Sequence, residues 1–142
     1  MTDNIAACSS IIGGELDIKA YMSDFEEGII QASKKSFPHV RYRKGCYFHF
    51  LQALSRKMQA IGMTQEYTFQ NVKKLGLLSV IPKDDIAIKG IPYLRKTLEF
   101  GLKKSDKNMW NEFWEYFNRQ WMKSHLVNMW NYHDDDDWKC EM

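Results

Sequence analysis

The chain contains 142 residues, of which 44% are hydrophobic, 14% aromatic and 27% charged, and its formal net charge is +2. This length fits one domain of ordinary size, and the five tryptophans add material for a core. A balance of this kind is normal for a soluble protein. No apolar run approaches the roughly 20 residues needed to span a bilayer, which argues against a membrane protein.

The cysteines and the first residues indicate the compartment. Cys8, Cys46 and Cys140 are too few and too widely spaced for a disulfide framework, so they are interpreted as reduced thiols. The start of the chain lacks the basic and apolar regions of a signal peptide. We therefore expect an intracellular protein, in the nucleus rather than the cytoplasm.

The small net charge hides a local asymmetry. The segment 34–57 contains no aspartate or glutamate but seven basic residues: Lys34, Lys35, Arg41, Arg43, Lys44, Arg56 and Lys57. Four consecutive aspartates, 134–137, form the acidic counterweight. Such separation is typical of a face that binds a polyanion. The alternative is an ordinary solvated surface that binds nothing.

Two strands with a helix between them are predicted near the N-terminus. Residues 1–16 have little periodic pattern and are interpreted as a flexible N-terminal segment. Residues 18–22 match a short buried strand, and a helix follows that must end before Phe37-Pro38, because proline disfavours helix in the residue ahead of it. The alternation of apolar and basic side chains over residues 40–43 predicts a second strand.

Helices dominate the remainder. The spacing of apolar residues predicts a helix over 46–61, ended by Gly62. A second is predicted over 65–78, with Phe69, Val72 and Leu75 facing inward. A third begins near Pro92 and carries the stripe Ile91, Leu94, Leu98 and Leu102.

A further helix begins near Ser105-Asp106 and carries large aromatic residues at spacings of three and four: Trp110, Phe113, Trp114, Phe117 and Trp121. These rings could stack on nucleic-acid bases, but aromatic residues at helical spacing are more typical of a core. The four aspartates that follow are interpreted as a solvated acidic tail rather than a cation site.

Asp24 is the candidate catalytic residue, because it lies where the first strand gives way to a helix. Two-metal phosphoryl transfer uses clustered carboxylates to hold divalent ions, and a strand end fixes such a ligand while leaving it open to substrate. The alternative role is a helix cap, which Ser23 and Asp24 both suit. Ser23 with Glu26 also matches the spacing of a capping box.

Cys46 and His49 form a second candidate metal site. They lie within one helical turn and could share a zinc ion, although a closed zinc site needs four ligands. The other possible donors, His39, His133 and Cys140, lack ligand spacing. The simpler interpretation is a thiol and an imidazole that face the core.

The order and spacing of several short motifs resemble the catalytic region of MULE-type (Mutator-like) transposases. The resemblance covers about residues 18–132, and its elements are Ser23-Asp24-Phe25-Glu26, Phe37-Pro38, Gly45-Cys46-Tyr47-Phe48-His49-Phe50, Gln52-Ala53-Leu54, Lys73-Lys74-Leu75, Val80-Ile81-Pro82, Asp84-Asp85, Tyr116-Phe117, Trp121 and Trp130-Asn131-Tyr132. Each piece is weak alone, whereas the ordered set is specific.

The resemblance implies an RNase H-like fold whose DDE (Asp, Asp, Glu) site binds Mg²⁺ or Mn²⁺ and cuts and joins transposon DNA. Asp24 matches the second aspartate of the family, and Cys46 with His49 matches the Cys-His motif after it. The helices beyond Gln65 match the family's insertion.

The basic strand between these motifs supplies the expected DNA contacts. Arg41, Arg43 and Lys44 are the residues that we expect to bind DNA phosphates. The complete expectation is a helix-dominated α/β chain: a partial RNase H-like domain over 17–132, with a strand–helix–strand unit before an all-helical insertion, and an acidic tail over 133–142.

The departures from the family limit the expected activity. Residues 1–17 supply no strand with the first aspartate, and Glu141 is in no recognisable context for the final glutamate. One carboxylate cannot hold two metal ions, so we expect a truncated, inactive domain that binds no metal stably. The alternatives are a domesticated module that binds DNA or protein, and a nuclease completed by another chain. An incomplete sheet would also expose an apolar edge prone to self-association.

Overall fold

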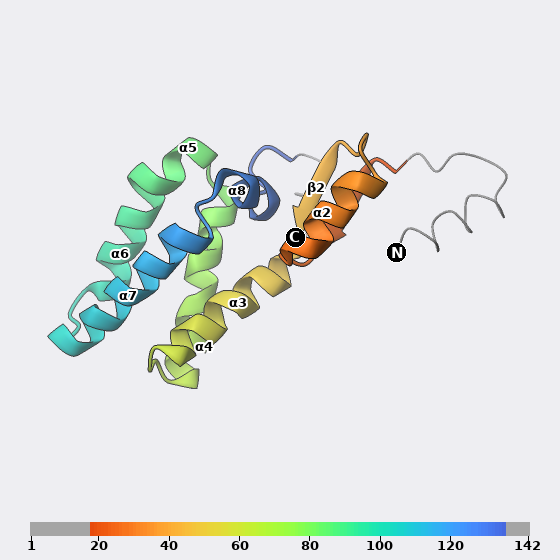
Figure 1. The fold of residues 1–142 in the computed structure, drawn as a ribbon. Coiled ribbons are helices and arrows are strands. Elements are labelled where there is room, and N and C mark those ends of the chain that lie inside the picture. Colours follow the sequence, from red (N-terminus) through yellow and green to blue (C-terminus); the bar gives the residue numbers. More distant parts are fainter. Residues whose placement is uncertain (1–17, 136–142) are drawn as a thin grey trace, which may run out of the picture.

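The computed structural model describes residues 18–135 and shows a helix-dominated α/β architecture that begins with a strand–helix–strand unit (Figure 1). This confirms the expected fold class. The elements are β1 (Ala20–Ser23), α2 (Glu27–Ser36), β2 (Tyr42–Gly45), α3 (Tyr47–Ala60), α4 (Gln65–Leu75), the 3₁₀ helix η1 (Gly76–Val80), α5 (Lys83–Asp85), the π-helix η2 (Ile86–Gly90), α6 (Ile91–Glu99), α7 (Lys104–Gln120) and α8 (Ser124–Trp130). The segment expected to be flexible, 1–16, lies outside the described residues.

The two strands pair in parallel, with Ala20 opposite Tyr42 and Ser23 opposite Gly45. Parallel neighbours need a crossover connection, and α2 supplies it. The second strand begins two residues later than the predicted range 40–43 because Val40 is buried in the preceding loop. Among the described residues the sheet has only these strands, and Met22 of β1 is 45% exposed. Self-association through this sheet stays a prediction.

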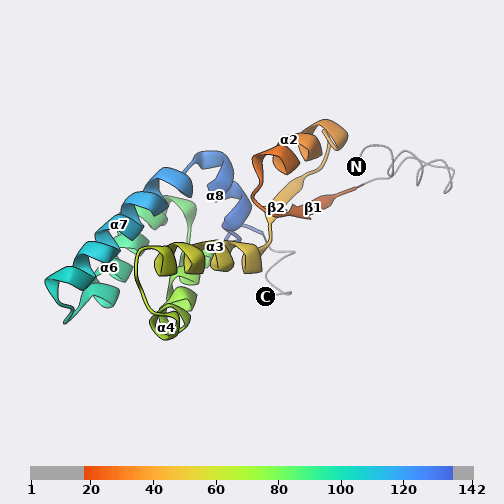
Figure 2. The ribbon, with the colours of Figure 1, turned by 60° about the horizontal axis from the view of Figure 1, so that its bottom comes forward.

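The strand–helix–strand unit lies at one end of the molecule, and helices α3 to α7 form a body at the other (Figures 1 and 2). Helix α8 lies between the two and contacts β2. The sequence patterns did not predict α8, which has only seven residues and too few turns for a clear period. No helix within residues 18–135 has both the length and the apolar character needed to cross a bilayer.

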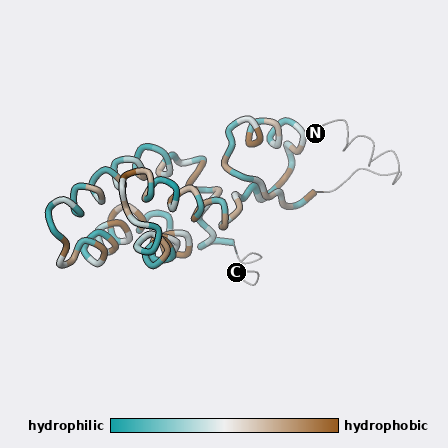
Figure 3. The backbone as a smooth tube through the Cα atoms, turned by 90° about the horizontal axis from the view of Figure 1, so that it is seen from below, coloured by the Kyte–Doolittle hydropathy of each residue, from teal (hydrophilic) through white to brown (hydrophobic). Residues whose placement is uncertain are grey.

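The aromatic stripe of α7 is buried, as the core interpretation predicts. Where the start of α3, the end of α7 and α8 meet, the ring of Phe50 stacks on Trp130 at 5.0 Å, and Trp121 meets Phe50 edge-on at the same distance. The indole of Trp130 donates to the Trp121 carbonyl at 2.9 Å. The tube in Figure 3 shows the apolar residues alternating with polar ones along these helices, so each helix buries one face.

Two local predictions fail. The capping box is absent: the Ser23 hydroxyl donates to the carbonyl of Asp24, and α2 begins only at Glu27. Phe69 is 69% exposed, because the buried face of α4 runs through Thr68, Val72 and Leu75. Phe69 lies about 100° around the helix from Thr68, outside that face.

Candidate functional site

Asp24 directly follows β1, as predicted, and its carboxylate supports the start of α2. Its Oδ1 accepts the backbone N–H of Glu26 at 3.0 Å. This hydrogen bond satisfies one of the donors at the helix entrance that otherwise lacks a partner. Asp24 therefore lies in a turn just ahead of the N-cap residue, Glu26, and is not itself the N-cap that the alternative interpretation predicted.

The donors near Asp24 do not fit a divalent-metal site. Within residues 18–135 no group of three or more histidine, cysteine, aspartate or glutamate side chains is placed to hold a metal ion. Two-metal phosphoryl transfer requires clustered carboxylates, and here one oxygen of a single carboxylate is engaged with the backbone. Assignment of Asp24 as a ligand for Mg²⁺ or Mn²⁺ would need donors from outside this range.

The Cys-His pair lies at the start of α3. Cys46 precedes the first residue of the helix and is half-buried. His49 is exposed, which corrects the interpretation that its imidazole faces the core. The face of α3 that is buried passes instead through Phe50, Leu54 and Met58. A zinc ion at this pair would likewise need further donors.

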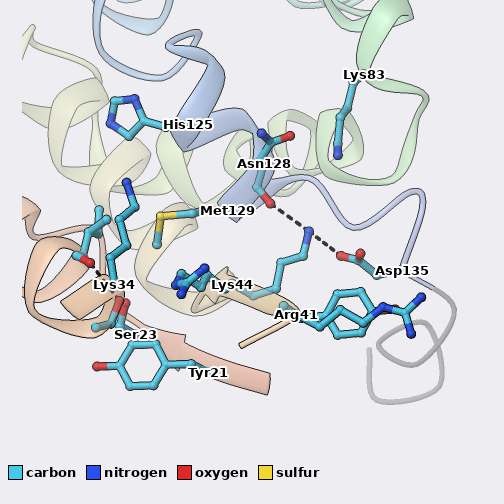
Figure 4. Close-up of a pocket in the computed structure, with 14 residues that line it drawn as sticks. Tyr21, Ser23, Lys34, Arg41, Lys44, Lys83, His125, Asn128, Met129 and Asp135 are labelled. Atoms are coloured by element: carbon cyan, nitrogen blue, oxygen red, sulfur yellow. Dashed lines mark hydrogen bonds and ion pairs between the residues drawn. The ribbon is translucent and has the colours of Figure 1, made fainter. Parts of the chain in front are cut away.

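A pocket of about 390 Å³ lies between the strand–helix–strand unit and α8, and basic side chains surround it (Figure 4). Ser23, at the end of β1, contributes to the lining, as does the basic segment around β2. The cationic or titratable basic residues in the lining are Lys34, Arg41, Arg43, Lys44, Lys83 and His125. The carboxylate among the described lining residues is that of Asp135.

Lys44 is the buried member of this set, with a side chain only 5% exposed. Its ammonium donates to the carbonyls of Asn128 and Asn131, each at 2.8 Å, and pairs with the carboxylate of Asp135. Burial lowers the pKa of Lys44 from its ordinary value, and the hydrogen bond and charge of Asp135 oppose this change. The three acceptors together compensate the buried charge.

This arrangement changes two sequence-based interpretations. The ammonium of Lys44 is engaged inside the protein, so it is not available for the DNA contact predicted for it. Asp135 is 7% exposed and packed against the strand, so it does not belong to a solvated tail. Asp136 and Asp137 lie outside the described residues.

Arg43 holds the loop before β2. Its Nη2 donates to the carbonyl of Phe37 at 2.5 Å and its Nη1 to the carbonyl of Val40 at 3.4 Å. Arg41, by contrast, is exposed, and its guanidinium lies 5.1 Å from the centre of the Tyr42 ring. Of the three predicted DNA contacts, only Arg41 therefore presents its charge outward.

Two further basic residues complete the pocket from the opposite side. Lys83 lies at the start of α5 and His125 in the first turn of α8. Lys83 is 3.8 Å from Asp134, and His125 is 3.6 Å from Glu27. Neither residue was predicted for a site, because no local sequence pattern separates Lys83 or His125 from other surface residues.

Tyr132 fastens the end of β2 to the segment after α8. Its hydroxyl donates to the carbonyl of Gly45, and burial raises its pKa well above the ordinary value of 10.0, with Cys46 and Asp135 adding to the effect. Gly45 is required here because a Cβ would overlap the ring of Phe25. The end of β2 is thus fixed by packing as well as by hydrogen bonding.

The chain matches no family model, no curated protein and no solved structure with which it was compared.

Lys44→Met should lower the free energy of unfolding by about 3–5 kcal/mol, because Asp135 then keeps a buried charge without its partner. The double variant Lys44→Met/Asp135→Leu should recover much of this loss. Lys57→Met is the matched control: its partner Glu112 has a 59% exposed side chain, so that ion pair should contribute at most about 1 kcal/mol. Urea denaturation of the wild-type chain and these variants measures the values. A Lys44→Met cost equal to that of Lys57→Met would contradict the buried-pair interpretation.

Tyr132→Phe should change how stability depends on alkaline pH. The raised pKa means that the unfolded chain releases the tyrosine proton first, so wild-type stability falls as pH rises above 10.0. The variant does not lose stability in this way at high pH. At neutral pH, however, its free energy of unfolding should be about 1–3 kcal/mol lower than that of the wild type, because the Gly45 carbonyl loses its donor. Lys44 is present in both chains, so its opposite effect cancels. Denaturation at several pH values should show that the difference in unfolding free energy between the wild type and Tyr132→Phe becomes smaller above pH 10.0. A difference that stays constant with pH would contradict a raised pKa for Tyr132.

Proposed function

We propose that this chain is a MULE transposase-like domain that binds the phosphate backbone of DNA through its basic pocket and does not cleave DNA by itself. The observation that carries the proposal is the convergence of basic side chains from α2, β2 and its preceding loop, α5 and α8 on one pocket. The resemblance of residues 18–132 to the transposase family adds DNA as the expected polyanion. A DNA partner in turn favours a nuclear location.

The charges around the pocket suit a phosphate backbone. Lys34 and Arg41 are exposed, so they can reach phosphate oxygens directly. Arg43 and Lys44 are held by protein acceptors, and they contribute positive potential rather than contacts. Such an interaction positions a duplex without reading its sequence.

We propose that the chain does not cleave DNA because it supplies too few carboxylate ligands for two metal ions. Asp24 is the carboxylate that matches the family's site, and one of its oxygens accepts the Glu26 N–H. In-line displacement needs several carboxylates to hold both metal ions. A nuclease completed by another chain is the competing hypothesis, and it needs Asp24 to contribute to the assembled site.

Binding of duplex DNA should weaken steeply with salt, because each phosphate contact releases counterions and adds about 0.9 to the log–log slope. Lys34→Ala/Arg41→Ala should reduce that slope by about 2 and weaken binding similarly for unrelated sequences. Fluorescence anisotropy across a salt series measures both quantities.

The matched control for this experiment is Lys96→Ala/Lys107→Ala. These exposed lysines lie on α6 and α7, at the end of the molecule away from β2 (Figure 1). The control should keep the wild-type slope. A wild-type slope near zero, or equal losses in the two double variants, would contradict a DNA-binding role for the basic pocket.

Supercoiled plasmid incubated with the protein and Mn²⁺ should show no cleavage above that of Asp24→Asn. The substitution keeps a side-chain oxygen for the Glu26 N–H, so the fold should be retained. Gel electrophoresis of the plasmid forms is the measurement. Cleavage that the wild-type chain supports and Asp24→Asn abolishes would overturn the non-catalytic part of the proposal and favour the nuclease.

A further inference from the structure

One nitrogen of the Arg43 guanidinium, the Nε, is buried without an acceptor. Its Nη1 and Nη2 donate to backbone carbonyls, but the Nε is buried and has no hydrogen-bond partner among residues 18–135. A buried donor left unsatisfied is costly, and native proteins seldom retain one without a reason. Arg43 also lines the basic pocket, so its positive charge acts on a ligand there, although the buried Nε itself is closed to solvent.

We propose that the pocket binds a phosphate monoester, the dianionic group found at the end of a nucleic-acid strand or on a small nucleotide. This deepens the proposed function and rests on it for the choice of nucleic acid as one source of the phosphate. The pocket volume of about 390 Å³ lies within the range of small-ligand sites.

The charge in the pocket matches a dianion. Two guanidinium groups, those of Arg41 and Arg43, have no carboxylate within 4.0 Å in the part of the chain that the structure describes. Lys44 is already paired with Asp135, so that pair adds no net charge. The charges of Arg41 and Arg43 are therefore available to a ligand, whereas Lys83 already lies 3.8 Å from Asp134. Guanidinium groups suit phosphate oxygens particularly well.

The geometry favours an end group over an internal linkage. Figure 4 shows Lys83 and Arg41 on opposite sides of the Lys44–Asp135 pair, with His125 and Lys34 at the other end of the pocket. Basic groups that face one another across a hollow can surround several oxygens of one phosphate. An internal diester has one charge and two ester links leading away from it, whereas a monoester has two charges and a single link. The higher charge and the single link of the monoester therefore suit this set of cations better.

The repulsion among the unliganded cations supports the same conclusion. Lys83 lies close enough to Lys44 for its charge to help lower the pKa of that ammonium. Like charges gathered in this way destabilise the free protein. A bound dianion would relieve the repulsion, so the ligand should stabilise the fold.

The test compares the full chain binding two oligonucleotides that differ only at the 5′ end, one phosphorylated and one with a free hydroxyl. The phosphorylated strand should bind about tenfold more tightly or better, the effect of one added charge-assisted interaction. Lys83→Gln should remove most of the advantage of the phosphorylated strand, and it should also weaken the hydroxyl-ended strand to a smaller extent, because the pocket loses one positive charge. Lys96→Gln, on α6, is the control and should preserve the difference.

A second arm identifies the source of the phosphate. If 5′-AMP raises the thermal midpoint, adenosine does not, and the two oligonucleotides bind equally, the pocket takes a small organic phosphate and the monoester assignment still holds. If the phosphorylated oligonucleotide binds no better than the hydroxyl-ended one, and 5′-AMP stabilises the protein no more than adenosine does, the monoester site is overturned.

The two proposals can fail separately. Salt-dependent binding of the hydroxyl-ended duplex, without any advantage from phosphate, would overturn the monoester site and leave the proposed DNA-binding function intact. Binding of 5′-AMP without any binding of DNA would support the monoester site and overturn the DNA-binding function.

Discussion

The buried ammonium of Lys44 is the interaction on which the arrangement of the site depends. It joins β2 to two carbonyls at the end of α8 and to the carboxylate of Asp135, across more than 80 residues of sequence. A two-stranded sheet is marginal in water without packing against another element. Here α8 supplies that packing, and Lys44 fixes it in one register because its three acceptors must all be reached at once. Both β2 and α8 contribute residues to the pocket lining, so the contact that joins them also shapes the pocket.

The basic residues on the segment 34–57 divide into two roles. Lys44 and Arg43 satisfy protein carbonyls and hold the loop and strand in place. Lys34 and Arg41 are exposed, and their charges remain available to a partner. The place of each residue in the fold explains the division: Arg41 precedes β2 and is exposed, Arg43 bonds the loop before the strand, and Lys44 faces α8. The number of basic residues in this segment is therefore larger than the number available to a partner, because some of them bond acceptors within the protein.

Sequence patterns predicted the parts of this fold that depend on local spacing. The strand–helix–strand order, the end of α2 before Pro38 and the buried stripe of α7 follow from periodicity and proline chemistry, and the structure confirms them. The Lys44–Asp135 pair could not be predicted, because an aspartate in an acidic run is normally solvated. The sequence around Asp135 also gives no indication of a partner as distant as Lys44. Lys83 and His125 were missed for the same reason: tertiary packing, rather than spacing, brings them to the pocket. Asp24 was placed correctly at a strand end, where capping and metal binding require the same position.

The sign of the potential at that strand end separates these two uses of Asp24. A two-metal site concentrates negative charge, since several carboxylates must offset two divalent cations. Ser23, the residue before Asp24, instead lines a pocket in which basic groups outnumber the single carboxylate of Asp135. A divalent cation entering this field would be repelled unless a phosphate came with it, whereas an anion would be attracted. Under the proposed function, this strand–helix junction takes phosphate among basic groups, and the interaction that the structure shows for Asp24 is its hydrogen bond to the Glu26 N–H ahead of α2.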